Sequence, residues 1–151
     1  MFRTELSDAL KDAMRAKEDR AVSTLRLILA ALKDRDIAAR GKGNSEGIGD
    51  QDILELLQKM VRQRRESIEL FEKGDRQDLA DKEAEEIEVI QRFLPKQLDP
   101  DQVRGAVQEV IEDLEAATIK DMGRVMAALK ERYPGRMDFG KASALVKERL
   151  A

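Results

Sequence analysis

A proline at position 95 constrains this chain more than any other residue, because it lies between two stretches whose apolar residues repeat with a helical period. Pro95 lacks a backbone N–H and disfavours helical geometry for Leu94, so a helix that reaches this point must end here. A new helix is predicted from Asp99, since aspartate is a good N-cap and the proline after it suits the first helical position. We therefore predict two parts, residues 1–94 and 95–151, joined by a stiff Leu-Pro elbow.

Composition predicts that both parts are all-α. Of 151 residues, 42% are hydrophobic and 39% are charged, but only 3% are aromatic, a balance typical of helical proteins. The absence of cysteine excludes disulfides, thiolate metal sites and cysteine nucleophiles, and the absence of histidine removes the usual general base and transition-metal ligand. No apolar run is long enough to span a membrane and the first residues lack a signal-peptide pattern, so we expect a cytoplasmic protein without cofactor, metal or membrane contact.

Apolar periodicity and turn residues predict the individual helices. The first part is expected to be a bundle or a set of hairpins of about four helices, over residues 3–17, 19–39, 50–73 and 76–93. The second is expected to be a compact three-helix domain, over residues 99–114, 119–132 and 139–150. The second helix of the first part is apolar on two faces, with Leu27 and Ala31 opposite its main stripe, so we expect it to be buried between the others.

Residues 41–49 contain four of the nine glycines. They lack the Gly-Lys-Ser/Thr ending of a phosphate-binding loop and follow no predicted strand. We therefore expect a flexible connector between helices, with a lid or a partner contact as the alternative.

Four charged residues fall on apolar helix faces of the first part, namely Arg26, Arg64, Glu83 and Glu86. Charged groups inside an apolar stripe must be paired or must reach solvent. One interpretation is a carboxylate metal site between helices, which uses inward-facing glutamates. With no histidine and two arginines at matching depth, we favour an internal ion-pair network that fixes the register of the helices.

The last thirty residues are the positive end of an acidic molecule. The chain has a formal net charge of −3, yet residues 119–149 hold eight basic side chains against four acidic ones. Residues 72–88 and 99–115 are strongly acidic. Such an asymmetry is typical of proteins that meet a polyanionic partner at one end.

Gly123 lies within the predicted helix over 119–132, where glycine costs roughly 1 kcal/mol relative to alanine. Lys120 and Arg124 stand one turn apart beside it. We expect something to approach the backbone closely at this glycine, either a neighbouring helix or a sugar-phosphate strand.

The sequence resembles the GatB/YqeY family over essentially its whole length. The resemblance is carried by the run that ends in the Leu-Pro-Lys-Gln-Leu joint, by the run Lys-Asp-Met-Gly-Arg-Val-Met, by a Gly-Arg-Met-Asp turn and by two earlier stretches. These segments are residues 83–98, 120–126, 135–138, 23–33 and 64–68. It implies an all-helical, two-part fold similar to the C-terminal region of the B subunit of the glutamine-dependent aspartyl/glutamyl-tRNA amidotransferase. In that enzyme the region engages tRNA, away from the chemistry, and the family label is carbon–nitrogen ligase with glutamine as amido donor.

Two functions from different classes remain open at this stage. In a tRNA-binding accessory module, phosphate contacts would come from the basic residues of the second part, with a glycine for close approach: Lys120, Gly123, Arg124, Arg136, Lys141 and Lys147. The alternative is a protein-interaction domain whose acidic or basic surface docks on a partner. An enzyme acting alone is disfavoured, since no activated nucleophile or phosphate loop is present, and ligase chemistry is expected only within a complex.

Overall fold

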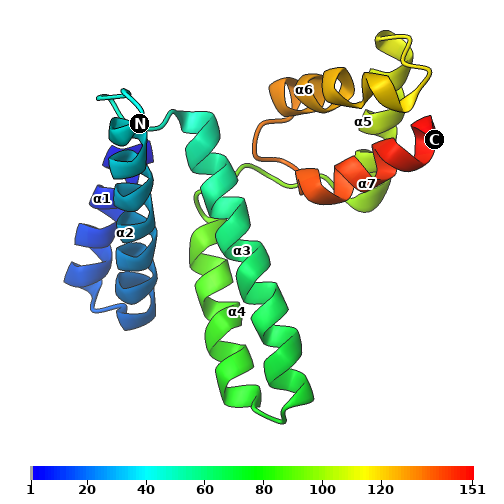
Figure 1. Ribbon diagram of the computed structural model, residues 1–151. Helices are drawn as coiled ribbons and strands as arrows, with labels where there is room; N and C mark the ends of the chain where they lie inside the picture. Colours follow the sequence, from blue (N-terminus) through cyan, green and yellow to red (C-terminus); the bar gives the residue numbers. More distant parts are fainter. Residues whose placement is uncertain (1) are drawn as a thin grey trace. The chain divides into compact units, whose positions relative to one another are not determined.

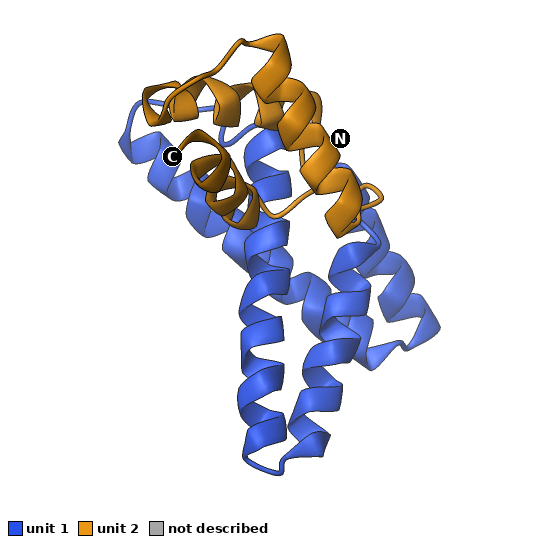
Figure 2. Cartoon of the chain, turned by 90° about the vertical axis from the view of Figure 1, so that its right-hand side faces the viewer, with its two compact units in different colours: residues 1–94 blue, residues 95–151 orange. Residues whose placement is uncertain are grey.

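The computed structural model describes residues 2–151, and the all-helical prediction is confirmed over these residues (Figure 1). The elements are α1 (Phe2–Ala16), α2 (Asp19–Gly41), α3 (Asp50–Lys73), α4 (Gln77–Gln91), α5 (Pro100–Asp113), the 3₁₀ turn η1 (Ile119–Asp121), α6 (Met122–Arg132) and α7 (Phe139–Leu150). The chain forms two compact units, unit 1 over residues 1–94 and unit 2 over residues 95–151 (Figure 2).

Unit 1 is built from two helical hairpins. Helices α1 and α2 form one pair, α3 and α4 form the other, and α2 contacts both α3 and α4 (Figure 1). The centre of the core is apolar and fully buried: Leu6, Ile28, Leu57 and Ile90 are each 0% exposed. Helix α2 is therefore the shared element of unit 1.

The prediction that α2 is buried on both faces is confirmed at Ala31, which is partly buried against the core, and is wrong at Leu27. Its inner side carries the buried residues Leu25, Ile28 and Leu32. On the opposite side, Leu27 is 47% exposed and Ile37 is 54% exposed. Figure 1 shows α2 between α1 and the α3–α4 pair, and the strip of α2 that includes Leu27, Ala30 and Ile37 remains exposed.

The glycine-rich loop between α2 and α3 has a defined path instead of the expected loose one. Asp36 accepts hydrogen bonds from the Arg3 guanidinium (2.7 Å) and from the Ile48 N–H (2.9 Å). The hydrogen bond from Arg3 is the main reason why the pKa of Asp36 is lowered. Gly47 has φ +86°, and a Cβ there would lie 2.5 Å from the Asp36 carboxylate, so glycine is required at this position.

Unit 2 is a three-helix domain with its own core, in which Val107, Val110, Val125, Leu129 and Val146 are each 0% exposed. Helices α6 and α7 form an antiparallel hairpin, and α5 packs against both (Figure 1). The expected N-cap of α5 is confirmed, and a capping box is closed by reciprocal hydrogen bonds between Asp99 and Gln102.

The segment that enters unit 2 is tied to the turn between α6 and α7. The Leu98 N–H donates to the Arg136 carbonyl (2.8 Å), and the Gln97 amide donates to the Gly135 carbonyl (2.6 Å). In return, the Arg136 guanidinium donates to the Lys96 carbonyl (3.1 Å). Residues 96–98 are therefore held in place by two main-chain carbonyls and the Arg136 side chain of the α6–α7 turn.

Candidate functional site

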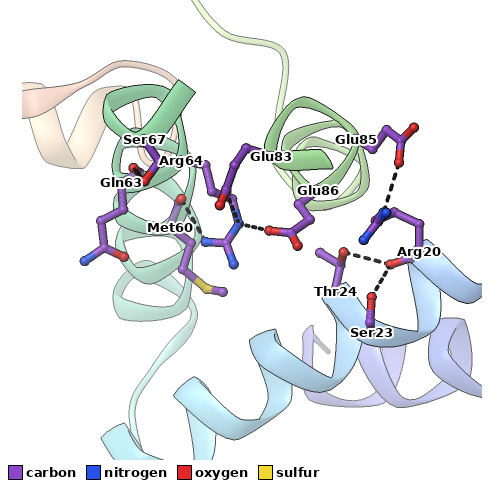
Figure 3. A network of polar contacts seen from close by, with 10 residues as sticks. All are labelled: Arg20, Ser23, Thr24, Met60, Gln63, Arg64, Ser67, Glu83, Glu85 and Glu86. Carbon is purple, nitrogen blue, oxygen red and sulfur yellow. Dashed lines mark hydrogen bonds and ion pairs between the residues drawn. The ribbon is translucent and has the colours of Figure 1, made fainter. Parts of the chain in front are cut away.

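Unit 1 contains an internal ion cluster centred on Arg64. Its Nε lies 2.9 Å from Glu86 Oε2 and 3.9 Å from Glu83 Oε2, and its Nη1 donates to the Met60 carbonyl (3.1 Å). Figure 3 shows Arg64 reaching from α3 towards the two glutamates of α4. The Arg64 and Glu86 side chains are only 13% and 9% exposed.

Arg26 does not belong to this cluster, although the sequence pattern placed it there. The Arg26 side chain is exposed. The pattern centred the inner face of α2 near Val22 and Leu29, but these two residues lie at the edge of that face and are only partly buried. Because one residue turns a helix by about 100°, Arg26 falls beyond the edge and points outwards.

Sequence reasoning missed two polar residues of α2, Arg20, which bonds to α4, and Thr24, which bonds to Arg20 within α2. Arg20 donates from Nε to Glu85 (2.9 Å), and the Thr24 hydroxyl donates to the Arg20 carbonyl (2.8 Å) (Figure 3). Thr24 is 0% exposed. In a sequence pattern, a threonine among apolar neighbours cannot be distinguished from an ordinary core residue. The only available signal was that a threonine hydroxyl can bond to the carbonyl four residues earlier in a helix, here that of Arg20.

The ion cluster holds one guanidinium for two carboxylates. The pKa of Glu83 is raised, mainly by burial and then by the negative charge of Glu86. Between Phe2 and Ala151, no group of three or more acidic side chains is arranged to hold a metal ion. The cluster is suited to fixing α3 against α4, and nothing in its geometry positions a substrate.

The structure divides the six predicted nucleic-acid contacts between two ends of unit 2. Lys120 lies in η1, and Gly123 and Arg124 lie in the first turn of α6. Because α7 runs antiparallel to α6, Lys147 in the last turn of α7 lies at the same end (Figure 1). Arg149, which is exposed there as well, was not among the predicted contacts.

Arg136 and Lys141 lie at the opposite end of unit 2, at the turn between α6 and α7. The length of α6, about 16 Å at 1.5 Å per residue, separates them from Lys120. Arg136 is partly buried and its Nε donates to the Lys96 carbonyl. The six residues therefore do not form one patch, and Arg136 has a structural contact within unit 2.

Arg124 is also engaged within the chain. Its Nη2 donates to Asp121 Oδ1 (2.8 Å) and lies 3.4 Å from the Leu114 carbonyl. The other Asp121 oxygen accepts from the backbone N–H groups of Ala117 (2.9 Å) and Thr118 (3.3 Å). The hydrogen bond from Ala117, followed by that from Arg124, lowers the pKa of Asp121 to about 2.

Gly123 faces open space. A Cβ built on Gly123 would meet no described atom within 4 Å, so no helix of unit 2 explains the glycine. Lys120 and Lys147 are both exposed at the same end. Of the two expectations for this glycine, close approach by a neighbouring helix is thus wrong.

A hollow of about 290 Å³ lies in unit 1 between α1, α2 and α4. Its walls are mostly small and apolar, including Ala9, Ala13 and Ala21, and its rim includes Glu18 and Arg92. None of the predicted site residues lines this hollow.

The described part of the chain contains no helix long and apolar enough to cross a membrane.

Comparison with known proteins places the chain in a family. Altered inheritance of mitochondria protein 41, mitochondrial, from Lachancea thermotolerans is 39% identical over 89 residues, which cover 59% of this chain and 46% of that protein. The protein of the same name from Vanderwaltozyma polyspora is 32% identical over 111 residues, or 72% of this chain and 58% of that protein. An uncharacterized protein from Schizosaccharomyces pombe is 33% identical over 87 residues, which cover 58% of this chain and 67% of that protein.

The chain thus spans only about half of the length of the first of these relatives. The model of the family described as "Yqey-like protein", by contrast, matches residues 3–150. That match covers both units, so the chain belongs to the Yqey-like protein family.

Proposed function

We propose that unit 2 is a tRNA-binding accessory module whose contact surface is the end of the α6–α7 hairpin with Lys120, Gly123 and Lys147. The observation that supports this most strongly is the open backbone at Gly123 between exposed lysines. A glycine without neighbours in a helix costs stability, and access for a ligand's sugar-phosphate strand is a reason to keep it.

The proposed contacts position RNA without reading its sequence. Lysine ammonium groups pair with phosphates as point charges, and main-chain approach at Gly123 brings a strand within their reach. Asp121 orients Arg124 by accepting a hydrogen bond from its Nη2, and the guanidinium keeps further N–H donors for a phosphate. Unit 2 has only two aromatic residues, Tyr133 and Phe139, which makes base stacking a minor part of the proposal.

The proposed role is accessory and not catalytic. Glutamine hydrolysis and amide transfer need an activated nucleophile, and the chain contains neither cysteine nor histidine. Any carbon–nitrogen ligase activity would come from a partner that binds the same tRNA. We propose that the protein acts in the cytoplasm. The names of the yeast relatives describe those proteins as mitochondrial, and we do not extend that location to this chain.

The experiment that tests the proposal measures binding of total tRNA by the full chain across a salt series. Lys120→Glu/Lys147→Glu removes two cations at the Gly123 end, and Lys96→Glu/Lys141→Glu makes the same change in net charge with two other exposed lysines. We expect Lys120→Glu/Lys147→Glu to weaken tRNA binding at least about tenfold. The slope of log affinity against log salt concentration should also fall by about 2 in magnitude, since each phosphate contact contributes about 1 to that slope. The second pair should change affinity less than about threefold.

Gly123→Gln separates close approach from charge. The substitution keeps the net charge and meets open space, so the helicity and melting temperature of unit 2 should not fall. We expect tRNA affinity to drop while folding is preserved. Equal weakening by both lysine pairs, or no tRNA binding by the wild-type chain at low salt, would contradict the proposal.

A further inference from the structure

The outer face of α2 in unit 1 is exposed along most of the helix and is largely apolar. Leu27 and Ile37 are about half exposed, and the small residues between and beside them, Ala30 and Ala38, are exposed as well. Ten residues separate Leu27 from Ile37, which corresponds to about 15 Å along the axis. Between Leu27 and Ala38 the face contains one charged side chain, Asp34.

A line of cations runs along one edge of this face. Arg26, Lys33 and Arg40 follow one another at intervals of seven residues, so they lie almost in one column along the helix. All three are exposed. Asp19 precedes them in the same column, at the first residue of α2.

This face contributes nothing visible to the folding of unit 1. The buried residues of α2, Leu25, Ile28 and Leu32, lie on its other side, and none of the exposed residues named above belongs to the core of unit 1. Single exposed apolar residues are common in soluble proteins, but an apolar stripe with a charged border along one helix is typical of a helix-binding surface.

We propose that the outer face of α2 docks an amphipathic helix of another protein, whose apolar stripe is bordered by acidic residues. The apolar side chains of that helix would pack on Leu27 and Ile37, and its small residues would approach Ala30. Its acidic border would lie against the column of Arg26, Lys33 and Arg40. A basic or amide side chain opposite Asp34 would fix the register, as a single polar position does in coiled coils.

A second copy of α2 fits this surface less well than an acidic helix. In an antiparallel pair of identical helices, like edges meet, so the basic column would face itself. In a parallel pair the basic column would meet the opposite edge, which carries Ala31 and Arg35 and no carboxylate. RNA is also disfavoured, because Leu27 and Ile37 occupy the centre of the face, where phosphates would lose hydration without gaining a partner.

The proposal is tested by selecting binders from a displayed library of three-heptad helical peptides, randomised at the apolar and bordering positions, against the full chain. Two variants serve as counter-targets: Leu27→Ser/Ile37→Ser removes the apolar contacts, and Arg26→Glu/Lys33→Glu/Arg40→Glu reverses the column. Because these side chains are exposed, both variants should melt like the wild type. The selected peptides should carry acidic borders and lose at least about tenfold in affinity for either variant.

Selection against the charge-reversed variant should instead enrich peptides with basic borders. The proposal is overturned if the selected peptides bind both variants as well as the wild type, or if their borders are not acidic. It is also overturned if the wild-type chain is a dimer that Leu27→Ser/Ile37→Ser converts to a monomer, which would make this face an interface between copies. Loss of tRNA binding in the charge-reversed variant alone would assign the column to RNA and would equally overturn it.

Discussion

Arg64 in unit 1 and Arg124 in unit 2 make the same kind of contact in opposite surroundings. Each donates to a carboxylate at 2.8–2.9 Å. The Arg64 side chain is 13% exposed and its partner Glu86 is 9% exposed, whereas the Arg124 side chain is 54% exposed and Asp121 is 25% exposed. Solvent can therefore replace the partner of Arg124 after a mutation, but not the partner of Arg64.

The difference assigns separate roles to the two pairs. A buried pair is costly to break because the remaining charge has no water to solvate it. An exposed pair contributes little to stability and remains accessible to an outside ligand. We therefore assign the Arg64 cluster to the packing of α3 on α4, and the Arg124 pair to the shape of the proposed RNA contact.

The largest expected effect comes from Arg64→Met, which leaves Glu83 and Glu86 without their cation. We expect unit 1 to lose about 3–5 kcal/mol in the free energy of unfolding, measured by urea denaturation at pH 7. The exposed residue Arg26 supplies the matched control, since Arg26→Met should change stability by less than about 0.5 kcal/mol. A loss below 1 kcal/mol for Arg64→Met would contradict the structural role of the cluster.

Two core truncations test whether the two parts of the chain fold separately, which we propose on the basis of their separate cores. Leu57→Ala in unit 1 and Leu129→Ala in unit 2 each remove a side chain that is 0% exposed, at an expected cost of about 2–5 kcal/mol. In calorimetry, each should lower one unfolding transition and leave the other in place. A single transition that both variants shift equally would show one cooperative unit.

Asp121 beside Arg124 and Glu83 beside Arg64 are expected to change the stability of the chain with pH in opposite directions. Because the folded-state pKa of Asp121 is lowered to about 2 from 3.8, its contribution to stability is present above about pH 4 and is lost as the pH falls towards 2. An NMR titration of the Asp121 carboxyl should give a midpoint near 2. Arg124→Gln should raise that midpoint without restoring the ordinary value, since the Ala117 N–H remains. A midpoint near 3.8 in the wild type would contradict the hydrogen bonds that Asp121 accepts from Ala117 and Arg124.

Glu83 should behave in the reverse sense. Its raised pKa means that the folded chain disfavours the charged form, so a penalty builds as the pH rises through the ordinary value of 4.5 and is fully present above the folded-state pKa. Glu83→Gln should therefore stabilise unit 1 slightly at pH 7 and have no effect near pH 3, by comparison of urea midpoints. A destabilisation at pH 7 would mean that Arg64 needs both carboxylates.

The smallest effect is expected at Gly123. Since a Cβ there meets open space, Gly123→Ala should stabilise α6 by up to about 1 kcal/mol, measured by thermal unfolding. The exposed Gly105 of α5 also has no neighbour within 4 Å, and Gly105→Ala is the control for a helix glycine away from the proposed RNA surface. Both variants should gain stability, but only the change at Gly123 should affect tRNA binding.

The helices could be predicted from the sequence because their apolar residues repeat with one period and their ends carry strong signals. Pro95 and Asp99 mark such an end and such a start. The depth of a charged residue was harder to predict in α2, where apolar residues lie on two faces of the helix. For this reason Arg26 was assigned to the wrong face, whereas Arg64 of α3 lies inside as predicted.

Two sets of contacts, one in each unit, join residues that are distant in the sequence and that no local pattern relates. Nothing in the sequence shows that Arg136 reaches the Lys96 carbonyl, 40 residues away in the chain. The path of the glycine-rich loop likewise depends on Asp36, which lies in the preceding helix and reaches the Ile48 N–H. In both places a charged residue that the sequence suggests is on the surface binds a main-chain group: Arg136 binds a carbonyl and Asp36 binds an N–H.

One measurement tests the central claim most directly: the salt dependence of tRNA binding by two charge-reversed full-length chains, one altered in each unit. Lys120→Glu/Lys147→Glu changes unit 2, and Arg26→Glu/Lys33→Glu changes the exposed column of unit 1 by the same net charge. We expect the first variant to lose at least about tenfold in affinity, with a salt slope smaller by about 2, and the second to bind like the wild type. The reverse result, with binding lost only in the unit 1 variant, would contradict the account.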